Sequence, residues 1–95
     1  MVFDISQVDG LGPYTLQQEK SRDLYLKDGR TFLVLHPNTI EVRCDARLSN
    51  LLKEKYESVM ESRYYGKGGI EIVLAGQLSP RELEDLVRLS YNLTV

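Results

Sequence analysis

The sequence has no tryptophan, one histidine, one cysteine and three prolines among its 95 residues. Because Cys44 is the only cysteine, no internal disulfide can form, and we expect a reducing, cytoplasmic environment. His36 is the only histidine, so the chain lacks the usual ligands of a zinc site, and we expect neither a metal nor a cofactor. No uncharged stretch approaches the roughly 20 apolar residues of a membrane span, and the N-terminus does not have the pattern of a signal peptide. We therefore expect no membrane contact.

The overall composition is ordinary for a small globular protein. Hydrophobic residues make up 42% and charged residues 27%, which predicts one domain over residues 1–95 with a single modest core. The net charge of −2 argues against a strong phosphate-binding surface. Residues 43–67 reverse this balance, with six basic and four acidic side chains. A solvated helix face explains most of that excess, and a binding patch is the alternative.

Alternating apolar residues predict an antiparallel sheet. The first expected strand is a short N-terminal edge strand formed by Val2, Phe3 and Ile5. A turn follows in the glycine- and proline-containing residues 9–13. Residues 23–27 alternate as a half-buried strand does, and Asp28-Gly29 favours a tight hairpin turn because both positions need positive φ. The apolar run RTFLVLH indicates a central strand and TIEVRC the next one, which together predict a three-stranded antiparallel meander.

Two helices are expected in the second half of the chain. Asp45 is a typical N-cap, and it precedes apolar residues at helical spacing, namely Leu48, Leu51, Leu52, Tyr56 and Val59. The glycines at 66, 68 and 69 then suggest a bend or a flexible hairpin tip, and residues 70–74 alternate as a long strand. Ser79, Pro80 and Glu82 form a capping box with proline at the first helical position. The pattern predicts an α+β protein with two helices packed on one antiparallel sheet.

From Ser21 to Tyr91 the chain resembles the MmcQ/YjbR family. The resemblance lies in the segments LYLKDGRTFLVLH, TIEVRCDARLSNLLKEKY, SRYYGK and LAGQLSPRELEDLVRLSY. It implies a small α+β protein of the double-wing type, for which DNA binding has been proposed from fold similarity. LYLKDGRTFLVL is also loosely similar to the N-terminal domain of TfoX-type competence regulators. Both resemblances rest on analogy between folds rather than on a site.

The chain departs from the family pattern in two places. Members usually begin with a long helix, whereas the first twenty residues here are typical of strand and turn. Members also carry a signature similar to Asn-Lys-x-His-Trp between their two halves. The matching segment here, Tyr65 to Gly69, keeps a lysine at Lys67 but has neither the histidine nor the tryptophan.

No catalytic constellation stands out among the polar residues. His36 precedes a proline at the end of a strand, where a turn residue is expected, and Cys44 lies in the buried phase of a strand. The acidic residues of the last helix cap and solubilise it, and GKGG lacks the spacing of a phosphate-binding loop. We therefore expect a binding module and not an enzyme.

One basic and aromatic cluster is the candidate site, because basic groups contact phosphates and tyrosines stack on bases or pack at interfaces. Its core is Arg63, Tyr64, Tyr65 and Lys67, which Arg43 and Arg47 could extend. An ordinary strand with one buried and one exposed tyrosine would explain the same residues. A rival function is protein interaction or homodimerisation through an N-terminal edge strand and the tyrosines. Small-molecule binding or catalysis would need a pocket that gathers Arg63, Tyr64 and His36.

Overall fold

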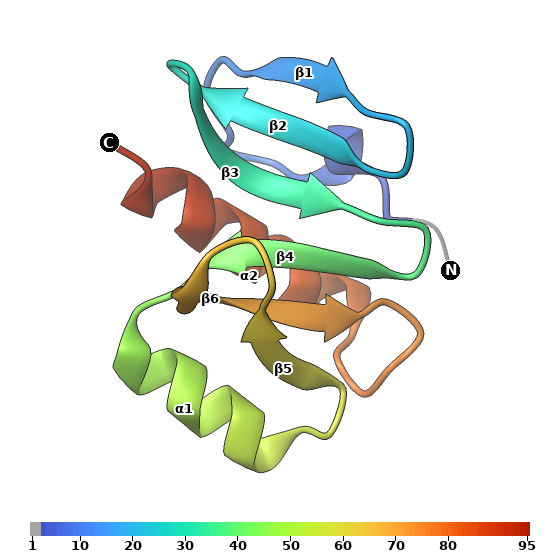
Figure 1. Ribbon diagram of the computed structural model, residues 1–95, viewed down its shortest axis with the longest axis vertical. Helices are drawn as coiled ribbons and strands as arrows, with labels where there is room; N and C mark the ends of the chain where they lie inside the picture. The colour runs from blue at the N-terminus through green and yellow to red at the C-terminus, as the bar shows by residue number, and fades with distance from the viewer. Residues whose placement is uncertain (1–2) are drawn as a thin grey trace.

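A computed structural model describes residues 3–95 as a six-stranded antiparallel sheet with two α-helices (Figure 1). The strands run in the spatial order β1-β2-β3-β4-β6-β5, and every neighbouring pair is antiparallel. In chain order the elements are a 3₁₀ turn η1 (Ile5–Gln7), β1 (Thr15–Gln18), β2 (Asp23–Lys27), β3 (Arg30–Leu35), β4 (Thr39–Arg43), α1 (Ala46–Lys55), β5 (Val59–Ser62), β6 (Gly66–Val73) and α2 (Pro80–Leu93). The predicted α+β class is confirmed.

The central meander follows from its turn chemistry and its apolar strands. Asp28 and Gly29 have φ angles of 50° and 80°, as a two-residue hairpin between β2 and β3 requires. Residues 31–34 of β3 are all buried, which confirms that this strand is central. β4 then pairs with β3 on one side and with β6 on the other, so the predicted meander of β2, β3 and β4 is also confirmed.

The helices and one face of the sheet enclose a single core. α2 contacts β3 and β4, behind which it lies in Figure 1, while α1 contacts β5 and β6. The predicted capping box starts α2, since Ser79 accepts a hydrogen bond from the Glu82 N–H and Glu82 accepts one from the Ser79 N–H. Deeper in the same helix, the buried Ser90 hydroxyl accepts from the Arg43 N–H (2.8 Å) and donates to the Phe32 carbonyl (2.6 Å).

The first helix is shorter than its sequence pattern predicts. It starts at the predicted cap, where the Asp45 carboxylate accepts from the Leu48 N–H (2.9 Å). It ends at Lys55, and Val59, which we expected in the helix, belongs to β5. Leu51, expected in the buried stripe, is 56% exposed. The helical spacing therefore continued past the real end of the helix, because residues from Val59 onward pair with β6 instead.

The N-terminal edge strand was predicted at the wrong place. Phe3 and Ile5 are buried, but Ile5 begins the 3₁₀ turn η1, and the edge strand β1 lies further on. Val2, the remaining residue of that prediction, lies outside the described residues. The glycines at 66, 68 and 69 also form the start of β6 rather than a flexible tip. A Cβ on Gly69 would lie 2.5 Å from the Val42 carbonyl oxygen, so the close approach of β4 explains this glycine.

The sheet face opposite the core carries two buried glutamates. Glu41 of β4 and Glu71 of β6 are cross-strand partners, and each lies between core residues of its own strand. Because neighbouring side chains of a strand point to opposite faces, both carboxylates lie on the face away from α2.

Among residues 3–95, neither helix has the length and apolar character needed to cross a bilayer.

Candidate functional site

The turn between β5 and β6 folds over the open face of the sheet. In Figure 1 it passes in front of β4, on the side opposite α2. The Ser62 hydroxyl accepts a hydrogen bond from the Tyr65 N–H (2.9 Å), and the Tyr65 carbonyl accepts one from the Gly68 N–H (3.2 Å). Gly66 leaves the turn with a φ of 61°, a conformation that favours glycine. These bonds present Arg63, Tyr64 and Tyr65 to β3 and β4.

Two arginines and two tyrosines form a continuous row on this face, which we call the arginine–tyrosine row. The Arg22 guanidinium lies 5.3 Å from the centre of the Tyr64 ring, and that of Arg43 lies 5.0 Å from the centre of the Tyr65 ring. The two rings meet edge to face, 4.9 Å apart. At these distances cations interact favourably with aromatic rings. The row thus joins the β1–β2 turn, the β5–β6 turn and the end of β4.

Thr31 of β3 anchors the row. Its carbonyl oxygen accepts hydrogen bonds from the Tyr65 hydroxyl (3.1 Å) and from Arg43 Nε (2.9 Å). Its side-chain oxygen lies 3.0 Å from the Tyr64 hydroxyl. Tyr65 is half-buried and Tyr64 is exposed. Consequently both tyrosines tie the turn to the sheet, and Tyr64 also exposes part of its ring to solvent.

Glu41 holds the turn from below. It is 1% exposed, and its carboxylate lies 2.5 Å from His36 Nε2. It also accepts hydrogen bonds from the Ser62 hydroxyl (2.7 Å) and the Tyr64 N–H (2.8 Å). Burial alone would raise the pKa of this carboxyl, but the hydrogen bonds from Tyr64, His36 and Ser62 outweigh it, so its pKa lies below the ordinary value. An ionised carboxylate only accepts hydrogen bonds, so the imidazole carries a proton on Nε2.

Glu71 holds the same turn through Arg63. The guanidinium donates two hydrogen bonds to this carboxylate, from Nε (2.9 Å) and Nη2 (2.7 Å), and the Thr39 hydroxyl donates a third (2.8 Å). Glu71 is 3% exposed whereas the Arg63 side chain is 70% exposed. Burial raises the pKa of the Glu71 carboxyl, but the hydrogen bonds from Arg63 and Thr39 lower it by more, so the net shift is downward. The positive charge of Arg63 is therefore largely balanced by the Glu71 carboxylate of β6.

His36, Glu41 and Glu71 also form a possible set of metal ligands. Their ligand atoms all lie within 4.8 Å of one another. However, each oxygen of the two carboxylates already accepts a hydrogen bond from the protein. A cation would have to displace Arg63 from Glu71 and the imidazole proton from Glu41. The arrangement is that of a satisfied buried network that positions the turn.

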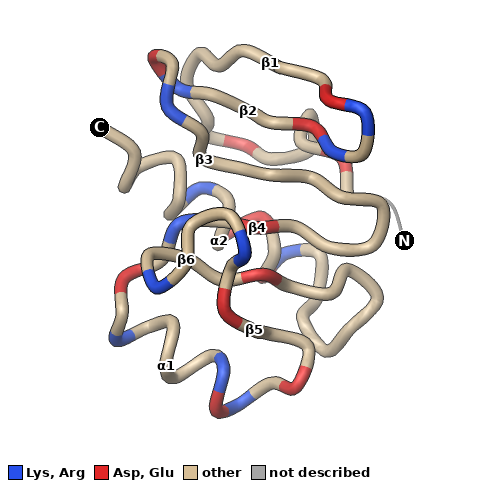
Figure 2. The backbone as a smooth tube through the Cα atoms, viewed as in Figure 1, with Lys and Arg blue, Asp and Glu red and all other residues tan. Residues whose placement is uncertain are grey.

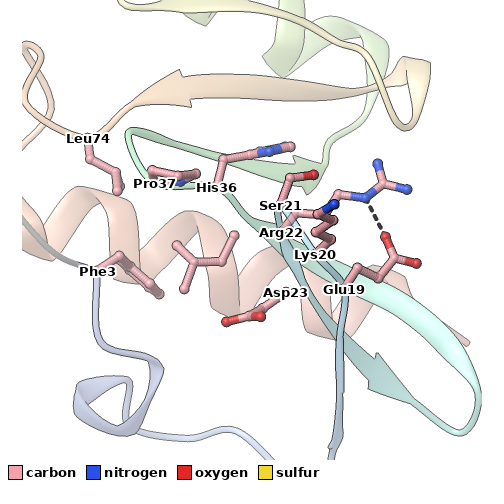
Figure 3. A pocket seen from close by; sticks show the side chains of 10 residues that line it. Phe3, Glu19, Lys20, Ser21, Arg22, Asp23, His36, Pro37 and Leu74 are labelled. Atoms are coloured by element: carbon pink, nitrogen blue, oxygen red, sulfur yellow. Dashed lines mark hydrogen bonds and ion pairs between the residues drawn. The ribbon is translucent and has the colours of Figure 1, made fainter.

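A cleft of about 420 Å³ opens beside His36, between the β1–β2 turn and the end of β3 (Figure 3). Figure 3 shows Phe3 and Leu74 at one end and Glu19, Lys20 and Arg22 at the other. Small-molecule binding was expected to need a pocket that gathers Arg63, Tyr64 and His36. The structure brings these three together around Glu41 and Glu71 by direct hydrogen bonds, and of the three it is His36 that lines the cleft.

The residues predicted for the site divide into two groups. Arg63, Tyr64, Tyr65 and Arg43 lie together on the open face, as described above. Lys67 instead lines a hollow beside α1 together with Lys53 and Glu61, and Arg47 is exposed in the first turn of α1. Basic positions do gather around the β5–β6 turn and α1, but acidic positions are interspersed with them (Figure 2).

Sequence reasoning missed the residues that organise this site, namely Arg22, Thr31, Glu41 and Glu71. A usable signal existed for the glutamates. Each stands between two β-branched residues in a strand, in TIEVR and in GIEIV. A charged residue in the middle of an apolar strand that has neighbours on both sides must find partners on the open face.

The chain was compared with protein-family models, with curated proteins and with solved structures, and none of them matches it.

Proposed function

We propose that the protein is a small, non-enzymatic binding module of MmcQ/YjbR type, and that its ligand is a nucleic acid bound in single-stranded form at the arginine–tyrosine row. The observation that carries this proposal is the row itself, with Arg22 and Arg43 at the two ends of a tyrosine pair. Sites for single strands combine cationic groups for the phosphates with aromatic rings on which bases stack. Exposed Tyr64 supplies such a ring.

The two arginines of the row retain donors for phosphate. Among the described residues, Arg22 uses Nε to bind Glu19 (2.7 Å), and Arg43 uses Nε to bind the Thr31 carbonyl (2.9 Å). Their terminal amino groups remain free to contact phosphate oxygens in a forked geometry. The cytoplasmic location that we propose agrees with this ligand and with the single, buried Cys44.

The charge balance sets the expected strength of binding. The net charge is −2, and both Arg63 and Arg22 are paired with glutamates, Glu71 and Glu19, so long-range attraction of a polyanion is weak. Two phosphate contacts on a single strand predict that log K falls with log salt concentration with a slope of about −1.4, at roughly 0.7 per phosphate. We expect modest affinity that is measurable at low salt.

The test is fluorescence anisotropy with a labelled single-stranded oligonucleotide of mixed sequence, titrated at several salt concentrations. Tyr64→Ala should weaken binding by about 1–3 kcal/mol, the usual contribution of one stacked base. Arg22→Ala should weaken binding and reduce the salt slope by about 0.7. Arg81→Ala removes the same charge from an exposed position at the start of α2 and serves as the matched control. No binding at low salt, or equal loss in Arg22→Ala and Arg81→Ala, would contradict the proposal.

A further inference from the structure

β1 is a short open edge of the sheet that carries no charged residue and no proline. The sheet ends at β1 on one side and at β5 on the other, and in Figure 1 nothing lies beyond β1. All four residues of β1 are exposed, and Leu16 is 47% exposed. Proteins usually protect such edges with charged side chains, prolines, bulges or a covering element. The strand TLQQ contains no charge and no proline.

The opposite edge has the protection that β1 lacks. β5 carries Glu61, contacts α1 and has a register irregularity next to Ser62. Each of these features hinders the addition of another strand. The contrast between the two edges points to β1 as the one available for pairing.

The register of β1 determines which backbone groups are free. The Glu19 N–H donates to the Arg22 carbonyl (2.9 Å), so Glu19 and Arg22 form a hydrogen-bonded pair at the end of the β1–β2 hairpin. In an antiparallel ladder such pairs alternate with pairs that are not hydrogen-bonded. Thr15 and Gln17 therefore direct their backbone groups toward β2, whereas Leu16 and Gln18 direct theirs away from the sheet.

We propose that β1 pairs antiparallel with β1 of a second copy of this chain, with Leu16 on the two-fold axis. In this register Leu16 lies opposite its own copy, and Gln18 lies opposite Tyr14. The outward N–H and carbonyl groups of Leu16 then meet the same groups of the second copy, and both sheets continue into one. Thr15 lies opposite Gln17, so no charged side chain of either strand faces a like charge.

The side chains of β1 also fit a second copy. The Leu16 side chain lies on the same face as Tyr25, its partner on β2, which belongs to the core. Tyr14 packs edge to face against Tyr25 and Phe32, at 5.8 and 5.9 Å, and is 38% exposed. The two leucines would cover each other and extend this apolar surface across the axis. A two-fold axis allows one uncharged strand to complement itself.

The test is sedimentation velocity of the full chain from micromolar to millimolar concentration. The native protein should sediment as a monomer at the low end and as a dimer at the high end. Leu16→Lys places two ammonium groups opposite each other on the axis and should remain monomeric throughout. Gln17→Lys adds the same charge to the same strand, but this position lies opposite Thr15, so it should still form the dimer. An equimolar mixture of Leu16→Lys and Leu16→Glu should regain the dimer, because opposite charges then meet on the axis.

Cross-linking tests the register independently. Hydrogen-bonded antiparallel partners lie about 5.5 Å apart between Cα atoms, within the range of a disulfide. Leu16→Cys should thus form a disulfide-linked dimer under oxidation, whereas Gln18→Cys should not. A native protein that stays monomeric at millimolar concentration would overturn the proposal. Equal behaviour of Leu16→Lys and Gln17→Lys, or cross-linking through position 18 instead of 16, would also overturn it.

Discussion

Replacing Glu41 with alanine should destabilise the protein strongly although the residue lies outside the apolar core. The substitution removes the acceptor of three hydrogen bonds, from His36, the Ser62 hydroxyl and the Tyr64 N–H. Ser62 is buried, so its hydroxyl cannot turn to solvent. Leaving a buried donor without its acceptor typically costs about 1–3 kcal/mol, and the substitution does this to several donors at once. That is a large part of the roughly 5–15 kcal/mol that stabilises a typical domain.

Glu41→Gln should cost much less, and the difference isolates the role of the acceptor. The amide oxygen still accepts from Ser62 and Tyr64, and the amide NH₂ can donate to His36 once the imidazole proton moves to Nδ1. What is lost is the strengthening of the bonds by the charge, about 1 kcal/mol. The expected order of stability is native protein, then Glu41→Gln, then Glu41→Ala.

The assay is urea unfolding followed by far-ultraviolet circular dichroism. Glu61→Ala is the matched control, because it removes an exposed glutamate from β5, which is separated from β4 by β6, and should change stability by less than about 0.5 kcal/mol. The comparison requires equal slopes with denaturant, so that midpoints report stability alone. If Glu41→Ala unfolded at the same urea concentration as Glu61→Ala, the hydrogen bonds to Glu41 would not be what holds the β5–β6 turn.

The buried carboxylates, the Ser90 hydroxyl and the Cys44 thiol each have a measurable consequence. The folded-state pKa values of Glu41 and Glu71 lie below the ordinary 4.5, so the stability that these carboxylates give the fold is complete above that pH and is lost as the pH falls through the folded values. Urea midpoints measured against pH should therefore fall on the acid side, and they should fall less steeply in Glu71→Gln. Ser90→Ala leaves one donor and one acceptor of the sheet unpaired under α2 and should lower the free energy of unfolding by about 1–3 kcal/mol, against little change for exposed Asn92→Ala. Burial raises the pKa of the Cys44 thiol to about 11, so a thiol reagent at neutral pH should modify it only as fast as the protein opens, and rapid modification of the native protein would contradict its buried place.

Local signals in the sequence were sufficient where the structure depends on local chemistry. A two-residue hairpin turn needs positive φ at both central positions, which Asp28 and Gly29 readily adopt. The capping box of Ser79 and Glu82 satisfies backbone donors within its own first turn. Neither feature depends on a distant partner. For the same reason the start of α1 at Asp45 could be predicted.

The end of α1 depends on distant partners and was therefore predicted wrongly. No glycine or proline interrupts residues 46–62, and the apolar spacing stays helical up to Val59. The chain nevertheless leaves the helix after Lys55, because Val59 gains a place in the core by pairing opposite Ile72 of β6. Such a gain depends on the whole sheet and overrides a weak local preference.

The site shows the same division between local and distant causes. The tyrosines and Arg63 could be singled out from sequence because they are adjacent and chemically distinctive. Their positions could not, because these depend on the pairing of Glu41 with Glu71, which are 30 positions apart in the chain.

The β5–β6 turn on the open face is held mainly by two buried carboxylates. Glu41 and Glu71 are buried in the middle of apolar strands, where an unpaired carboxylate would be costly. Their partners Arg63 and the Tyr64 N–H both belong to the β5–β6 turn, so satisfying the carboxylates fixes the turn. Because the turn is fixed, Tyr64 and Tyr65 lie between Arg22 and Arg43. The glutamates that lower the net charge of the protein are thus the residues that assemble its cationic and aromatic surface, and for that reason an acidic chain is compatible with the binding role that we propose.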